Sequence, residues 1–239
     1  MAVYAGVDTF WQAKRGIVQD GLVLNLDAGV TQSYPGNGTI WTDLSGNGNN
    51  GTLTNGPIFN GRGEGMSFDG VDDYFNIPES EGINLGNNNF SVSFWYKALT
   101  WLDSRPLIYK GGNITSNPGW MFRQISSGLQ FVLRTSTATS AVTYLNNSTN
   151  MWTNIVGIFN IGSKTEIYAN ATSVSSISNS LNSVANTLNI ELGRGLNSSS
   201  PGVMLYYNGS LENICIYNRA LSANEVQKNF NVTRKRFGI

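Results

Sequence analysis

The sequence predicts an all-β protein, built as a two-sheet antiparallel sandwich with one short helix close to the C-terminus. Short apolar segments recur at a spacing of roughly 10–15 residues and are separated by turn-forming residues, which is typical of sandwiches. The chain contains 31 Asn and 27 Gly, and such residues favour turns and discourage long helices. Its 239 residues are a normal length for one sandwich and enough to bury a core without disulfides.

Apolar and polar side chains alternate most regularly in residues 90–97 (FSVSFWYK), as expected for a strand with one face on the core. Turn clusters at residues 45–51 and 55–57 separate neighbouring segments. The expected strands, in chain order, are residues 22–26, 66–68, 74–77, 90–96, 107–109, 120–124, 129–134, 141–145, 152–159, 165–169, 188–192, 203–207 and 211–217.

One helix of about two turns is expected near residues 222–229. Ser222 and Glu225 fit a capping box, in which the serine side chain accepts from the backbone N–H of Glu225 and the glutamate side chain accepts from that of Ser222. Val226 and Phe230 would then pack on the sandwich.

Composition excludes several classes of protein. Fifteen basic and fifteen acidic residues give a net charge of zero, which argues against a strongly basic nucleic-acid binder. The chain has no histidine, so Ser-His-Asp machinery and histidine-ligated zinc are excluded. Cys215 is the single cysteine, so we expect a reduced thiol with a packing role. No apolar run is long enough for a membrane span, and we expect neither membrane insertion nor a signal peptide.

The first twenty residues differ from the rest, and we expect an N-terminal arm at 1–20 before a sandwich domain at 21–230. The arm lacks alternation and carries Trp11 beside Lys14 and Arg15. It either lies along its own domain or docks on another subunit, with Trp11 as the anchor. Aromatic residues and arginine are typical of interface cores, which favours an attachment role.

Residues 231–239 are expected to form a basic C-terminal tail. Arg234, Lys235 and Arg236 precede an apolar end. These three charges either contact phosphate or an acidic partner, as a second attachment element, or are solvated.

No catalytic constellation is evident, and we expect no enzyme. Asp72 and Asp73 are adjacent, so on a strand they point to opposite faces and cannot form the acid and base pair of a glycosidase. A serine nucleophile would have no histidine base and no Gly-x-Ser-x-Gly elbow. Asp69, Asp72 and Asp73 lie around a turn and are the residues that would supply calcium with oxygen ligands. The alternative is a hairpin turn at Asp69 with solvated acids, so no metal site and no cofactor are assigned.

With no catalytic residues and no metal site assigned, the remaining function is the binding of a ligand. Sugars are held by aromatic faces together with amide and guanidinium hydrogen bonds, and one region combines these groups. The candidate carbohydrate-binding residues are Trp101, Asn113, Asn117, Trp120 and Arg123. Tryptophan in a sandwich is more often part of the core, and that alternative stays open for both indoles.

Several motifs together resemble the laminin-G-like, concanavalin-A-like lectin/glucanase domains. They cover the region from about residue 21 to 230. The opening motif and central strand are matched at residues 21–28 (GLVLNLDA), 41–51 (WTDLSGNGNNG), 68–74 (FDGVDDY) and 90–95 (FSVSFW). The later strands and closing helix are matched at residues 152–159, 166–170, 207–221 and 222–226.

The resemblance implies a jelly-roll sandwich of two curved sheets. The glucanases of that superfamily carry an alternating acidic strand that this sequence lacks, so their activity is not implied. The laminin-type calcium site uses an acidic side chain near residues 113–117, where this chain offers amides and hydroxyls, and a pair of acids where it has Glu212 and Asn213. The resemblance therefore implies no calcium site.

The arm, the Asn/Ser/Thr-rich body and the final residues are similar to laminin-G-like structural proteins of tailed phages, especially marine ones. The resemblance implies a non-enzymatic virion surface protein, on a capsid or a tail, whose partners are other virion proteins or copies of itself. The alternative is a glycan-binding adhesin for host-surface glycans. A glycosidase is the third hypothesis.

Overall fold

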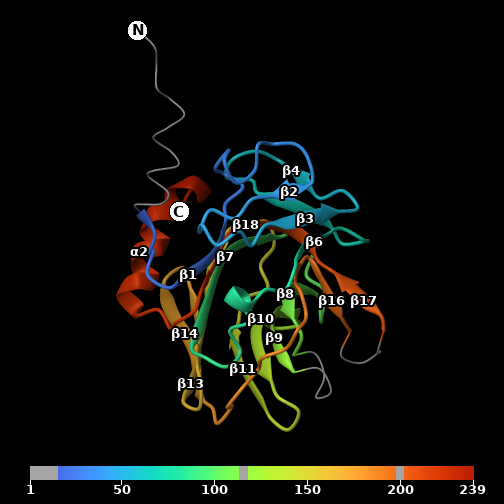
Figure 1. Ribbon diagram of the computed structural model, residues 1–239. Helices are drawn as coiled ribbons and strands as arrows, with labels where there is room; N and C mark the ends of the chain where they lie inside the picture. Colours follow the sequence, from blue (N-terminus) through green and yellow to red (C-terminus); the bar gives the residue numbers. More distant parts are fainter. Residues whose placement is uncertain (1–15, 113–117, 198–201) are drawn as a thin grey trace.

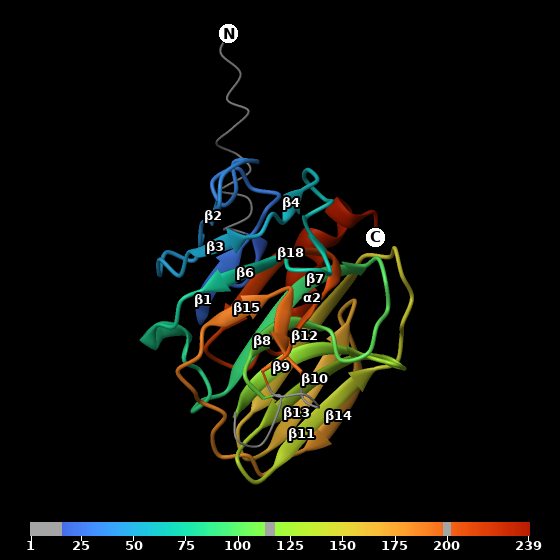
Figure 2. The same cartoon turned by 90° about the vertical axis from the view of Figure 1, so that its right-hand side faces the viewer.

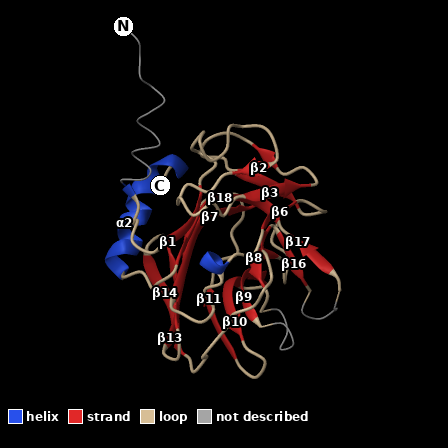
Figure 3. Ribbon diagram, in the orientation of Figure 1, coloured by secondary structure: helices blue, strands red, loops and turns tan. Residues whose placement is uncertain are grey.

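The protein is a sandwich of two antiparallel sheets, as the sequence predicts. The computed structural model describes residues 16–112, 118–197 and 202–239. Two sheets of eight strands each face one another, and every pairing between described strands is antiparallel. Helix α2 (Ala223–Thr233) lies outside one sheet, and the hairpin of β16 (Arg194–Leu196) and β17 (Met204–Tyr206) lies outside the other (Figures 1 and 3).

The two sheets are named here by the element that lies outside them. The helix-side sheet has the order β14 (Thr172–Ser178), β13 (Lys164–Ala169), β12 (Thr153–Asn160), β7 (Phe90–Ala98), β18 (Asn208–Tyr217), β5 (Met66–Asp69) and β4 (Ile58–Phe59), with β1 (Leu22–Leu26) also paired to β18. The hairpin-side sheet has the order β11 (Thr139–Tyr144), β10 (Gly128–Arg134), β9 (Gly119–Ile125), β8 (Pro106–Lys110), β15 (Ile190–Leu192), β6 (Tyr74–Ile77), β3 (Gly51–Thr54) and β2 (Ile40–Trp41).

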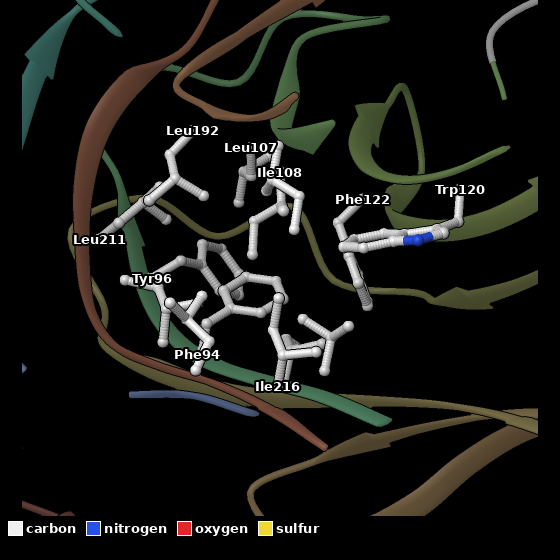
Figure 4. Close-up of a cluster of buried hydrophobic side chains, with 14 of the residues drawn as sticks. Phe94, Tyr96, Leu107, Ile108, Trp120, Phe122, Leu192, Leu211 and Ile216 are labelled. Carbon is white, nitrogen blue, oxygen red and sulfur yellow. The ribbon is translucent and has the colours of Figure 1, made fainter. Parts of the chain in front are cut away.

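The core lies between the sheets and is dense in aromatic rings. Phe94 on β7 meets Phe122 on β9 with ring centroids 4.9 Å apart, and Phe122 stacks on Phe131 of β10 at 4.4 Å. Figure 4 shows Phe94 and Phe122 converging with the aliphatic residues of β8 and β18. Gly157 on β12 has no room for a Cβ, which would lie 2.4 Å from the ring of Phe122, so this glycine permits the close approach of the sheets.

The alternation in β7 does not separate a buried face from an exposed one, because both faces are covered. Phe90 and Phe94 face the core, whereas Trp95 faces outward and is still fully buried. The outer cover is the C-terminal segment. Trp95 stacks on Phe230 of α2 and on Phe237, with centroids 5.7 and 4.0 Å away, and its indole N–H donates to the Thr233 hydroxyl at 3.0 Å.

The helix begins as the sequence predicts, but the residues after it are not a free tail. Both halves of the capping box between Ser222 and Glu225 are present, and Val226 and Phe230 are buried. The chain continues from α2 into a 3₁₀ turn at Arg234–Phe237. The expectation of a solvated basic tail is therefore corrected. The Phe237 ring, stacked on Trp95, and an internal ion pair, described below, fix this segment to the helix-side sheet.

The end of the expected N-terminal arm also packs on α2. Ile17 and Val18 are buried, and the Val18 backbone N–H donates to Asn229 Oδ1 at 2.8 Å. Trp11, Lys14 and Arg15 lie outside the described residues.

Cys215 gives a first testable prediction. The thiol is buried on β18, 3.6 Å from Asn25 Oδ1, and burial raises its pKa above the ordinary value. A protonated, buried thiol is a poor nucleophile, so we expect no reaction with a thiol reagent in the native protein. One equivalent should react in denaturant. Stoichiometric labelling of native protein, or a disulfide-linked dimer on a non-reducing gel, would contradict this packing role.

Candidate functional site

The outer face of the hairpin-side sheet is the first place where polar and aromatic groups gather. On β9, Trp120 and Phe122 belong to the core, so strand alternation directs Arg123 to the opposite, outer face. Its Nε and Nη2 donate to Gln130 Oε1 of β10, at 3.1 and 2.9 Å. In the view of Figure 2 this sheet lies toward the reader, with β8, β9, β10 and β15 in front of α2. A guanidinium and an amide are thus held side by side in one row.

A cleft of about 270 Å³ lies where the β16–β17 hairpin meets this face. Tyr109 of β8 lies at its base, and Glu191 of β15 supplies a carboxylate. The hairpin approaches closely because Gly195 carries no side chain: a Cβ there would lie 2.8 Å from the Tyr109 ring. The cleft is lined by Tyr109, Leu188, Asn189, Glu191, Leu196 and Met204.

One end of this cleft is fixed by a stacked ion pair. Arg194 Nη2 donates to Glu191 Oε1 at 2.5 Å, and the guanidinium lies 3.3 Å from the centre of the Tyr74 ring. Because Ile190 and Leu192 are buried in the core, Glu191 between them faces outward. The cleft therefore places an amide and an oriented carboxylate beside apolar walls, which is the usual composition of a small-ligand site.

On this face, the described strands β9, β10 and β11 do not carry the carboxyl pair of a glycosidase. A glycosidase needs two carboxyl groups on opposite sides of the scissile bond, roughly 5–9.5 Å apart. The outward positions of β9, β10 and β11 hold no carboxylate, and Glu191 on β15 is paired with Arg194.

The residues predicted to bind sugar are only partly brought together. Arg123 lies on the outer face described above. Trp120 is buried in the core with its ring 5.5 Å from Phe90, so it has no face to offer a ligand. Trp101 is partly buried against the core, and its indole N–H donates to the carbonyl of Ile125 at 2.7 Å. Asn113 and Asn117 lie outside the described residues.

The acidic turn is confirmed as a group of three neighbours. The carboxylates of Asp69, Asp72 and Asp73 lie within 4.8 Å of one another. Asp69 Oδ1 accepts from the Val71 backbone N–H, and Asp73 Oδ2 accepts from that of Asp69. Asp73 is buried and not solvated, and burial with the two neighbouring acids raises its pKa to about 6. These contacts are those of a hairpin turn closed by Gly70 at φ 80°.

A second polar site lies on the opposite side of the sandwich, where β1 and β18 meet the C-terminal segment. Arg236 Nη1 bridges Asp27 Oδ1 at 2.5 Å and Glu212 Oε1 at 2.9 Å. Asp27 and Glu212 are 2 % and 0 % exposed, so this is an internal cluster of three charges. Asn213 follows at φ 49° in a β-bulge of β18 and donates to Asp27 Oδ2. Such bulges re-aim side chains next to functional sites.

Of the basic residues predicted to serve attachment, Arg236 is therefore internal and ion-paired. Lys235 is exposed, and Arg234 lies 5.9 Å from the centre of the Phe230 ring. The internal pairing joins residues 209 positions apart, which no local pattern in the sequence indicates.

Glu212 gives a prediction on pH. Burial outweighs the attraction of Arg236 and raises the pKa of Glu212 from 4.5 to about 7. A carboxyl group with a raised folded-state pKa binds more protons in the folded state, so its contribution is full below pH 4.5 and is lost as pH rises through 7. The free energy of unfolding should fall by up to about 3 kcal/mol across this window.

The measurement is urea unfolding of wild type and Glu212→Gln between pH 4.5 and 8. Asp73 titrates in the same direction up to about pH 6, so the difference between the two proteins isolates Glu212. Parallel pH profiles would show that Glu212 does not titrate in this window.

The fold and the outer face define a lectin-like β-sandwich, and comparison with known proteins agrees. The Laminin_G_3 family model, described as the concanavalin A-like lectin/glucanases superfamily, matches residues 69–227. The chain therefore belongs to this superfamily, which confirms the family resemblance in the sequence. A search of curated proteins gives no match.

Solved structures show the same sandwich at low sequence identity. The binding domain of Paraclostridial Mosquitocidal Protein 1 is similar at 22 % identity and a TM-score of 0.69, over 89 % of this chain and 52 % of that one. The botulinum neurotoxin serotype D binding domain is similar at 18 % and 0.69, over 90 % and 52 %. The botulinum neurotoxin DC binding domain, solved in complex with SialylT, is similar at 19 % and 0.67, over 89 % and 52 %. The chain spans about half the length of these structures, and the likeness concerns the fold.

Proposed function

We propose that this chain is a non-catalytic recognition module that binds glycans on the outer face of the hairpin-side sheet. The observation that carries the proposal is the cleft beside β16–β17, where Tyr109, Asn189 and Glu191 line one cavity. Sugars present hydroxyl groups around an apolar ring face, and this cleft places the Asn189 amide and the Glu191 carboxylate beside the apolar side chains of Leu188, Leu196 and Met204. The neutral net charge of the chain agrees with recognition by hydrogen bonding and packing.

Two of the similar solved structures are complexes of a binding domain. One similar binding domain is that of botulinum neurotoxin DC in complex with SialylT, and another structure of it is in complex with rat synaptotagmin II. Modules of this fold thus occur as binding domains of toxins. For this chain, glycan recognition is the proposal that its own cleft favours.

The experiment is a glycan array probed with the full chain, together with a reducing-sugar release assay on every glycan that binds. We expect selective binding without release of reducing ends. Binding to no glycan on a broad array would overturn the recognition proposal. Release that continues over time would identify a glycosidase.

We propose the surface of a tailed-phage virion as the setting of this recognition, with other virion proteins or further copies of the chain as partners. The support is the similarity of the N-terminal arm and the Asn/Ser/Thr-rich body to laminin-G-like phage structural proteins. In the described part of the chain, no helix is both long and apolar enough to cross a bilayer. The test is whether the protein co-purifies with intact particles and where its density lies. Its absence from purified particles would contradict the virion setting.

A further inference from the structure

A second cavity, of about 420 Å³, lies on the side of the sandwich opposite the proposed glycan face. It is bordered by β1, β18, the loop of residues 60–65 between β4 and β5, and the C-terminal segment. Its volume lies in the range of small-ligand pockets. We call it the helix-side pocket, and the glycan proposal makes no use of it.

The one carboxylate that lines the pocket is already fully used by the chain itself. Asp27 Oδ1 accepts from Arg236 Nη1 and from the Gly29 backbone N–H, at 2.5 and 3.0 Å. Asp27 Oδ2 accepts from Arg236 Nη2 and from Asn213 Nδ2, at 3.2 and 3.0 Å. A carboxylate has about four acceptor sites, so these bonds leave none for a ligand. The pocket therefore does not offer Asp27 to a cation.

The remaining charged residue of the lining, Arg62, is a cation without an anionic partner. Its Nη2 donates to the Thr31 hydroxyl. Among the residues that the structure describes, no carboxylate lies within ion-pair distance of it. Its loop is held against the C-terminal segment, because a Cβ on Gly63 would lie 2.8 Å from the Arg236 carbonyl oxygen. The pocket thus presents one positioned guanidinium whose natural complement is a negative charge.

The other walls of the pocket are apolar or uncharged. Ile17, Val30 and Val232 line it with aliphatic side chains, and Asn25 adds an amide. Aliphatic walls favour an apolar ligand body, and a single unpaired guanidinium matches a single negative charge. A planar carboxylate fits the two parallel N–H groups of a guanidinium. These features together define an organic acid with a short apolar body.

We propose that the helix-side pocket binds a small organic carboxylate, with its acid group on Arg62 and its apolar body against Ile17, Val30 and Val232. This is a second ligand site, separate from the cleft on the other sheet. The proposal goes beyond glycan recognition and does not depend on it.

The test titrates the full chain with three probes that share one six-carbon body: hexanoate, hexanol and hexylamine. Burial raises the pKa of Glu212, the second partner of Arg236, to about 7. At pH 6 this carboxyl is mostly protonated, so its charge does not oppose that of Arg62. The side-chain amide signals of Asn25 and Asn213 in ¹⁵N NMR spectra report on binding inside the pocket.

Hexanoate should shift both amide signals with a dissociation constant on the order of 1 mM. It should bind about tenfold more tightly than hexanol, because a hydrogen bond to a charged group contributes more than one between neutral groups. Hexylamine should bind most weakly. Amide signals that stay in place at hexanoate concentrations far above this dissociation constant would overturn the proposal, and so would hexylamine binding as tight as that of hexanoate.

A matched pair of variants tests the role of Arg62. Arg62→Gln keeps hydrogen-bond donors at the position but removes the charge. It should weaken hexanoate binding about tenfold, to the level of hexanol, and leave hexanol binding unchanged. Lys235→Gln removes an exposed charge that does not line the pocket and should bind hexanoate like wild type. Thermal melting checks that both variants are folded. Unchanged hexanoate affinity in Arg62→Gln, or an equal loss in both variants, would overturn the assignment.

Discussion

Arg236→Met should lower the free energy of unfolding by about 3–5 kcal/mol, because it leaves two buried carboxylates without their counter-charge. Asp27 and Glu212 are almost fully buried, and the one guanidinium bridges both. For a chain of this size the melting temperature should fall by roughly 6–20 °C. Urea and thermal unfolding at pH 7.5, where Glu212 is largely ionised, measure the effect.

Two further variants make this result specific. Lys235→Met removes the neighbouring exposed charge and should change stability by no more than about 0.5 kcal/mol. Adding Glu212→Gln to Arg236→Met should restore part of the loss, because without Arg236 the Glu212 carboxyl is buried either as an unpaired charge or after taking up a proton, and glutamine requires neither. Equal stability of wild type and Arg236→Met would mean that the C-terminal segment is solvated after all.

Trp120→Ala is expected to be the second large effect, with a loss of about 3–5 kcal/mol, typical of truncating a buried tryptophan. The indole is 1 % exposed and packs against Phe90 and Phe122 between the sheets. The void cannot collapse without moving both sheets. Calorimetry or urea unfolding measures the loss.

Glycan affinity separates the core role of Trp120 from a ligand role. Below its melting temperature, Trp120→Ala should bind glycans within about twofold of wild type, a difference well under 1 kcal/mol. Stability close to that of wild type combined with abolished binding would reverse the assignment and place this indole in the ligand site.

The sheets and the helix could be predicted from the sequence because their signals are local. Alternation in residues 90–97 and the capping box at Ser222 each depend on neighbouring residues. Strand β14 (Thr172–Ser178) was not predicted. It is an edge strand of mostly Ser and Thr, exposed along nearly its whole length, so no buried face imposes an alternating pattern.

The site could be predicted only where the alternation of side chains along a strand shows which of them face the core and which face outward. In β9, Trp120 and Phe122 lie on the same face of the strand. This alternation alone would have placed Trp120 in the core and Arg123 on the outer face. The pairing of Arg236 with Asp27 and Glu212 depends on the closed sandwich, which brings β1, β18 and the C-terminus together. The cleft likewise arises from tertiary packing, since Tyr109 and Met204 meet only when the hairpin folds over β8.

The measurement that bears most directly on the glycan-recognition account compares two tryptophan substitutions on the β16–β17 hairpin. Met204 lines the cleft, whereas Val203 is its neighbour in sequence, is 48 % exposed and does not line the cleft. Titration of the best glycan from the array against Met204→Trp should show at least a tenfold loss of affinity, about 1.4 kcal/mol, because the new side chain fills the cavity. Val203→Trp should bind like wild type. Equal affinities for wild type and Met204→Trp would contradict the assignment of glycan binding to this cleft.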